Sequence, residues 1–250
     1  MGGVDRKPFQ GITNIIRFNW HYYALGIGLM FILILCRGFF SPELNIVVSV
    51  IILLTTVGFI LSLVVSYYIY DYSDIYRLHW LNSLTINPGS RLVNIHAGFD
   101  ETSALLTTKY NHSELAVYDF YNPSLHTEAS LERARKAYPA YYGTIKVSTS
   151  AIPLEPSTID CVFLIFSAHE IRNMDERILF FKQLQRALKP NGRIVVTEHL
   201  RDAANFMAYT IGYFHFFSKT NWLRVFKEGG LTLEQETKIT PFISTFILKK

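Results

Sequence analysis

Two pairs of histidine and glutamate stand at positions where they could transfer protons. His169-Glu170 and Glu198-His199 each follow a short apolar run of strand length. A histidine changes its charge near neutral pH, and a neighbouring carboxylate can orient its ring. The predicted catalytic residues are therefore His169, Glu170, Glu198 and His199. His169 is the first candidate for a general base, with Glu170 or Glu198 orienting it.

The same region allows two other interpretations. Glu170 could belong to a structural ion-pair network whose other members are Arg172, Arg201 and Asp202. The two histidines and two glutamates are also of the types that bind transition metals. Adjacent His and Glu residues match no established ligand spacing, however, so we predict no metal site.

Apolar runs that alternate with helix-like segments must position these residues. Strands are expected at 91–95, 115–118, 144–147, 160–166 and 193–197, and a closing hairpin at 231–238 and 242–249. Helices are expected at 71–84, 102–110 and 128–138, from Asp175 to the stop signal Lys189-Pro-Asn-Gly192, and from about Trp222 to Gly229-Gly230. This alternation is typical of an α/β fold with a mostly parallel sheet, in which ligands bind beyond the carboxyl ends of the strands.

The chain from Asn87 to its C-terminus resembles the class I S-adenosylmethionine-dependent methyltransferases. Ile159-Asp-Cys-Val-Phe-Leu-Ile165, a helix, and Arg186-Ala-Leu-Lys-Pro-Asn-Gly192 match the family's fourth strand and the R-x-L-K-P-G-G pattern before its fifth strand. The resemblance implies a Rossmann-like, seven-stranded sheet with a C-terminal antiparallel hairpin. It also implies that strands four and five are neighbours, which would bring the two His/Glu pairs side by side.

The resemblance further implies a cofactor site for S-adenosylmethionine. The family's acidic residue and G-x-G-x-G loop correspond to Asn94-Ile-His-Ala-Gly98-Phe-Asp100, which keeps only Gly98. Asp119 ends the second strand, where the family has an acid that accepts hydrogen bonds from both ribose hydroxyls. The segment 148–153 resembles the one that passes over the adenine, and Asp100 or Glu101 could face the cationic end. The predicted cofactor-binding residues are Asn94, His96, Ala97, Gly98, Phe99, Glu101, Asp119, Phe120, Ser148 and Thr149.

Two apolar runs precede this domain. Residues 18–36 and 44–70 contain no Asp, Glu, Lys or Arg, and about 20 apolar residues suffice to cross a bilayer as a helix. The sequence predicts a transmembrane hairpin in domain 1–72, followed by a methyltransferase-like domain at 73–250. One spanning helix plus a buried soluble helix is the alternative. Arg6, Lys7 and Arg17, against Asp5, place the N-terminus and the domain after Tyr70 in the cytoplasm.

The aromatic, uncharged segment from Asn205 to Phe217 follows the last parallel strand. At about 13 residues it is too short to span a membrane. It is expected either to pack on the sheet or to form an apolar lid that lines an acceptor pocket and touches the bilayer. In the second case His215 and Asn205 would project polar groups into that pocket.

The predicted function is a membrane-anchored methyltransferase that acts on a lipophilic small molecule, such as a quinol-like phenol, an isoprenoid or a lipid-linked aromatic. The net charge of +4, without a Lys/Arg-rich run, argues against nucleic acid as a partner. Cys36 and Cys161 form no paired motif, which suits a reducing compartment. The alternatives are a catalytically inactive methyltransferase-like module for binding or assembly at the membrane, and a different reaction on the same cofactor.

Overall fold

A single seven-stranded sheet organises the computed structural model of the chain, which describes residues 6–126 and 128–250. The strand order is β3-β2-β1-β4-β5-β7-β6. Strands β1 to β5 pair in parallel, while β7 is antiparallel to both β5 and β6. The bounds are β1 Arg91–His96, β2 Glu114–Asp119, β3 Ile145–Lys146, β4 Ile159–Ile165, β5 Leu188–His199, β6 Thr232–Thr240 and β7 Ile243–Lys249. The predicted mostly parallel, Rossmann-like sheet with a closing antiparallel hairpin is confirmed.

Strand β4 shows why the sheet forms where the longest apolar run lies. Its side chains alternate between two hydrophobic clusters, so both of its faces are covered, as is usual for a central parallel strand. Val162 and Leu164 pack with Phe180 and Phe181 of the following helix. On the opposite face, Cys161 and Phe163 pack with Leu78, Leu81 and Leu106.

The helices of the domain are α3 Ser103–Lys109, α4 Ala129–Ala137, α5 Met174–Ala187, α6 Ala203–Tyr209 and α7 Lys219–Glu228. Helix α5 begins as its sequence predicts, because the side chain of Asn173 accepts a hydrogen bond from the backbone N–H of Glu176 at 3.0 Å. The aromatic segment from Asn205 to Phe217, called the lid below, contains most of α6 and a 3₁₀ segment at Thr210–His215.

Two expectations are wrong in detail. The segment 71–84 is not an amphipathic helix: a π-helical turn, Tyr68–Tyr72, and a 3₁₀ turn, His79–Ser83, flank an irregular stretch. Ile75, Leu78 and Leu81 are all buried there, so tertiary packing outweighs the local helical pattern. Strand β5 begins at Leu188 rather than 193, since Leu188 already pairs with Ile159 before a shift in register.

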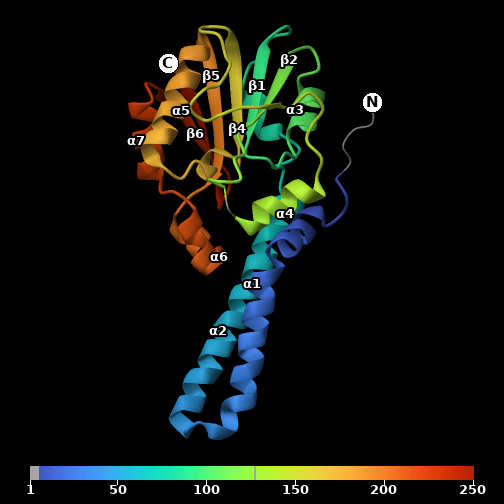
Figure 1. Ribbon diagram of the computed structural model, residues 1–250, viewed down its shortest axis with the longest axis vertical. Helices are drawn as coiled ribbons and strands as arrows, with labels where there is room; N and C mark the ends of the chain where they lie inside the picture. The colour runs from blue at the N-terminus through green and yellow to red at the C-terminus, as the bar shows by residue number, and fades with distance from the viewer. Residues whose placement is uncertain (1–5, 127) are drawn as a thin grey trace.

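The N-terminal part forms a hairpin of two long helices that projects away from the sheet (Figure 1). Helix α1 spans Gln10–Leu35 and α2 spans Pro42–Tyr67, joined by a 3₁₀ turn at Cys36–Phe39. Their most apolar windows have mean hydropathies of 1.8 and 2.7 and are almost unburied, so both are long and apolar enough to cross a membrane. Asp5, which enters the charge comparison above, lies outside the described residues.

Helix α1 starts well before the predicted residue 18 because its first turns pack on the soluble domain. The backbone N–H groups of Gly11 and Ile12 donate to the carboxylate of Asp71 at 2.7 and 2.8 Å. A carboxylate at a helix N-terminus satisfies free N–H groups and complements the helix dipole. The hairpin is therefore fixed to the domain by polar contacts at its base.

Candidate active site

The carboxyl ends of the parallel strands face the base of the helical hairpin. Helices α4 and α6, which follow β2 and β5 in the chain, lie below the sheet in Figure 1, next to the upper part of the hairpin, and they pack against α1 and α2 respectively. Ligand sites of α/β sheets lie at this edge. The predicted catalytic and cofactor-binding residues therefore gather beside the two apolar helices.

At the ends of β4 and β5, the structure brings His169, Glu170 and Glu198 together. Nδ1 of His169 lies 2.6 Å from Oε2 of Glu198, and its Nε2 lies 3.3 Å from Oε1 of Glu170. Burial alone would lower the pKa of His169, but the two carboxylates outweigh this and raise it to about 10. Burial likewise opposes ionisation of Glu170, yet the neighbouring imidazoles hold its pKa at about 2. His169 is thus an imidazolium between two carboxylates.

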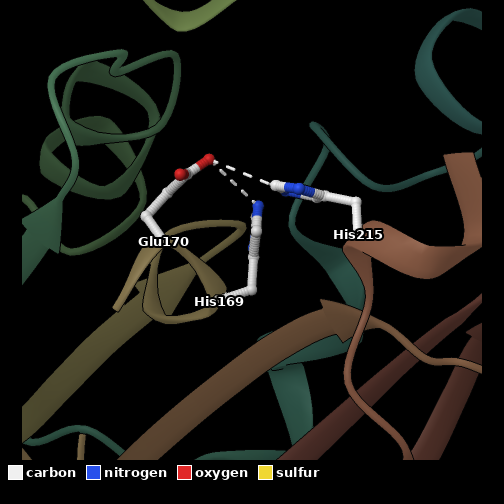
Figure 2. Close-up of side chains that lie close together, drawn as sticks. All are labelled: His169, Glu170 and His215. Carbon is white, nitrogen blue, oxygen red and sulfur yellow. Dashed lines mark ion pairs between the residues drawn. The ribbon is translucent and has the colours of Figure 1, made fainter. Parts of the chain in front are cut away.

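His215, from the end of the lid, completes this cluster. Its Nδ1 lies 2.8 Å from Oε1 of Glu128, and its Nε2 lies 3.9 Å from Oε1 of Glu170. Figure 2 shows Glu170 facing both imidazole rings, and the centroids of the two rings are 4.9 Å apart. The sequence suggested His215 only as a polar group of the lid, because nothing in its spacing connects it to the His/Glu pairs.

His199 does not join the cluster, although the sequence grouped it with His169. Its Nε2 hydrogen-bonds with the Tyr70 hydroxyl at 2.7 Å, and its Nδ1 with Oδ1 of Asn205 at 3.0 Å. The ring stacks on Phe166 and Phe216, and burial lowers its pKa to about 4. His199 is therefore a neutral link between the hairpin and β5. Asn205 is buried beside it instead of pointing into an acceptor pocket.

The alternative ion-pair network does not form. Arg172 donates to the carbonyls of His169 and His215 at 3.1 and 2.7 Å. Arg201 donates to the carbonyls of Phe216 and Phe214. Asp202 caps α6 through the backbone N–H of Asn205. Arg172 and Arg201 are not available for ion pairs within this set, because their guanidinium groups donate to backbone carbonyls that the 3₁₀ segment and its flanking residues leave free.

The loop after β1 is built around Gly98 and two partly unpaired polar residues. Gly98 has φ +94, a left-handed conformation that suits glycine, and its N–H donates to Nδ1 of His96 at 3.0 Å. Asp100 uses Oδ1 to accept from the backbone N–H groups of Thr102 and Ser103. His96 Nε2 and Asp100 Oδ2 are buried and have no hydrogen-bond partner among residues 6–126 and 128–250.

Asp119 lies at the end of β2, opposite this loop. Its Oδ1 accepts from the N–H of Tyr121 at 2.9 Å, and its Oδ2 pairs with Nη1 of Arg135 at 2.7 Å. A methyl group in place of the Gly98 hydrogen would collide with the Arg135 guanidinium. Arg135, on α4, therefore lies over Gly98 and neutralises the acid predicted to bind ribose. The imidazole of His96 lies beside them: its Nδ1 accepts from the Gly98 N–H at 3.0 Å and is 3.9 Å from Oδ1 of Asp119.

The other predicted cofactor residues around the loop have contacts within the protein. Asn94 is buried and donates to the hydroxyls of Thr102 and Ser103 at 3.0 and 2.8 Å, which positions the start of α3. Ala97 and Phe120 belong to the main hydrophobic cluster. These contacts hold the loop after β1 in place from its protein-facing side.

Phe99 and Glu101 face the first helix. Phe99 packs edge-on against Phe18, 5.7 Å between ring centroids. Oε1 of Glu101 accepts from Arg6 at 2.7 Å and from Gln10 at 3.0 Å, and its Oε2 accepts from the Tyr76 hydroxyl. The Glu101 carboxylate thus binds the start of the hairpin rather than presenting itself to the loop.

Ser148 and Thr149 lie on a segment held by α5. The Gln183 side chain donates to the Thr149 carbonyl at 2.7 Å and accepts from the N–H of Ile152 at 2.9 Å. Ser148 hydrogen-bonds with the Ser150 hydroxyl. Beside them, Ser150, Ile152 and Gln183 help to line an open depression.

Comparison with known proteins agrees with the fold. Residues 98–196 match the family model described as "Methyltransferase domain". A SAM-dependent methyltransferase from Aquifex aeolicus superposes with a TM-score of 0.51 at 15% identity, over 71% of this chain and 94% of the other. A chain from the Haloferax volcanii complex of the Trm112 methyltransferase activator with its methyltransferase partner gives 0.53 at 11% identity, over 72% and 90%. No curated protein matches the sequence.

Residues 98–196 therefore carry a methyltransferase domain, and the chain has the fold of these similar proteins, whose cofactor is S-adenosylmethionine. The residues present fit that cofactor chemically. Gly98 permits close approach of the ligand, Asp119 offers a carboxylate for two hydroxyls, and the unpaired Asp100 oxygen can accept from its cationic end. In the conformation described here, the Arg135 guanidinium takes this place and must move for the cofactor to enter.

Proposed function

We propose that this protein is a membrane-anchored methyltransferase that transfers the methyl group of S-adenosylmethionine to a lipophilic acceptor. The observation that carries the proposal is the position of the His169 cluster under the lid. Phe206, Met207, Ile211 and Phe214 of that lid are exposed. Because α6 also packs against α2, this apolar surface continues that of the hairpin, as expected of a segment that enters a bilayer surface.

The flanking charges support a cytoplasmic position for the domain. Arg6, Lys7 and Arg17 lie at the domain end of the hairpin, whereas Arg37 and Glu43 offset each other at its tip. Positive residues favour the cytoplasmic side of a membrane. Anchoring would confine the enzyme and a membrane-resident acceptor to one surface and raise their effective concentration.

The cluster suits methyl transfer to a hydroxyl or phenol. Bound S-adenosylmethionine supplies an electrophilic methyl group. The protein must align the acceptor oxygen with it, exclude water and manage the proton that the acceptor loses. The 2.6 Å contact between His169 Nδ1 and Glu198 Oε2 supports an orienting role for Glu198. The imidazolium of His169 can stabilise negative charge on the acceptor oxygen, and Glu170 or a deprotonated His169 can receive the proton.

One observation favours a second candidate, a catalytically inactive module for binding or assembly. Arg135 already satisfies Asp119 and covers Gly98, so a chain without cofactor would be stable in this form. A domain of this fold need not be active.

One experiment separates the two functions. The full chain in lipid nanodiscs, loaded with membrane extract, is incubated with methyl-labelled S-adenosylmethionine. We expect label in the lipid-soluble fraction and S-adenosylhomocysteine in equal amount. Calorimetric titration with S-adenosylmethionine runs beside it, and no binding heat at high concentration would support the inactive module.

A further inference from the structure

Three side chains at the edge of the sheet present metal-ligand atoms to one another. His169, Glu170 and His215 each offer one ligand atom, and these atoms all lie within 4.8 Å of one another. They come from two elements, the 3₁₀ turn Ala168–Glu170 after β4 and the 3₁₀ segment at the end of the lid. Figure 2 shows them directed toward a common point.

The distances suit a transition metal. Four ligands arranged tetrahedrally with bonds of about 2.1 Å lie about 3.4 Å from one another. Oε1 of Glu170 is 3.3 Å from Nε2 of His169 and 3.9 Å from Nε2 of His215. Small rotations of the His215 side chain would therefore bring all three atoms to bonding distance of one ion.

A second observation concerns the other nitrogen of each ring. Nδ1 of His169 is held by Glu198 at 2.6 Å, and Nδ1 of His215 by Glu128 at 2.8 Å. Both rings thus have a carboxylate on one nitrogen and direct the other nitrogen at Glu170. Histidines that bind metals almost always show this arrangement, because the outer carboxylate fixes the tautomer and strengthens the ligand.

The charges of the cluster also favour a cation. Three carboxylates, those of Glu128, Glu170 and Glu198, surround two imidazoles. The nearby Arg172 does not neutralise them, since it donates to the carbonyls of His169 and His215 and so fixes the two ligand-bearing segments. The side chains of His169, Glu170 and His215 are only 14%, 10% and 25% exposed, so solvent screens the charges at the three ligand groups weakly, whereas the outer carboxylate of Glu128 is 45% exposed.

We propose that His169 Nε2, the Glu170 carboxylate and His215 Nε2 bind one divalent transition-metal ion. Zn²⁺, or another ion that prefers imidazole and carboxylate ligands, fits this set. The proposal differs from the expectation of no metal site, and it takes His215 in place of Glu198 and His199 of the four-residue set considered from the sequence. Three protein ligands leave an open position for water or an oxygen of a bound molecule. If the proposed methyl transfer holds, that position would orient and acidify the acceptor hydroxyl.

The test uses the full chain without a polyhistidine tag, purified in detergent and stripped with a chelator. Titration with Zn²⁺ is followed by calorimetry, and titration with Co²⁺ by its visible absorption bands. We expect one ion per chain and a Co²⁺ spectrum typical of low coordination number.

The Zn²⁺ affinities of single variants identify the residues that bind the ion. His215→Ala and His169→Ala should each lower Zn²⁺ affinity at least a hundredfold. Glu128→Gln and Glu198→Gln, which change only the outer carboxylates, should lower it about 10- to 100-fold. His79→Ala is the matched control, because His79 is an exposed histidine beside Asp74, and it should leave the affinity unchanged.

Two results would overturn the proposal: no Zn²⁺ binding by the wild type beyond that of the double variant His169→Ala/His215→Ala, or equal affinities in wild type and His215→Ala. Since the Ala variants could misfold, His215→Gln is measured as well, with circular dichroism as a check of folding. Metal binding is scored without S-adenosylmethionine. An enzyme that fails to transfer methyl groups but binds one ion would therefore refute the proposed function alone.

Discussion

The two halves of the functional edge differ in how their polar groups are satisfied. At the ends of β1 and β2, Asp119 is paired with Arg135, and Glu101 with Arg6. At the ends of β4 and β5, His169 and His215 both face Glu170. The first half must break an ion pair before a ligand enters, whereas the second is already arranged around a common point. If the second half is the acceptor site, as proposed, cofactor entry and acceptor chemistry depend on different side chains, which variants can separate.

The largest effect is expected in turnover, from the half at the ends of β4 and β5. His169→Ala should lower the rate of S-adenosylhomocysteine formation by roughly 10²- to 10⁴-fold, the usual contribution of a positioned acid or base. Its affinity for S-adenosylmethionine, measured by calorimetry, should change little, because His169 does not contact Gly98 or Asp119. Unchanged turnover in this variant would remove His169 from the mechanism.

The second-largest effect is expected in cofactor binding, from the half at the ends of β1 and β2. Asp119→Asn should weaken S-adenosylmethionine binding by about 10- to 100-fold, since a hydrogen bond to a charged group contributes about 1.5–3 kcal/mol. Calorimetry on the full chain measures it, and Zn²⁺ affinity serves as the control that should not move. If the affinities for S-adenosylmethionine and Zn²⁺ fell together, the two halves would form one coupled site and would not be independent.

A smaller effect is expected in stability rather than in activity. The pKa of His199 is lowered to about 4, below the ordinary value of about 6.5 that it regains on unfolding. Above pH 6.5 both states are neutral. As the pH falls from 6.5 toward 4, the unfolded state binds a proton that the native state does not, so stability is lost by up to about 1.4 kcal/mol per pH unit.

Denaturant titrations of wild type and His199→Gln at pH 7, 6 and 5 test this. The free energy of unfolding of the wild type should approach that of the variant as the pH falls. Parallel pH profiles would show that His199 titrates alike in both states.

The smallest effect concerns Arg135. This side chain is 26% exposed, and partly exposed ion pairs contribute about 0–1 kcal/mol. Arg135→Gln should therefore tighten S-adenosylmethionine binding by at most about fivefold. Weaker binding in the variant would mean that the guanidinium contacts the bound cofactor instead of competing with it.

The sequence predicted what depends on local patterns. The apolar run of β4, the Asn173 cap of α5 and the turn before β7 are all encoded within a few residues, and each lies where it was expected. The contacts of His215 with Glu170 and of Arg135 with Asp119 were not predicted, because they join elements that meet only in the folded chain. The segment 71–84 was mistaken for a helix because its apolar residues match helical spacing but are buried individually against the sheet.

The polar contacts at the base of the hairpin have a consequence for what the protein can reach. Asp71 holds the start of α1, Glu101 binds Arg6 and Gln10, and Arg133 of α4 donates to the Phe18 carbonyl at 2.6 Å. These contacts hold the domain in a fixed orientation relative to the hairpin. If the hairpin spans a bilayer, as proposed, the edge that carries the site would stay at one depth and tilt, and it would act on acceptors whose reactive atom lies at that depth.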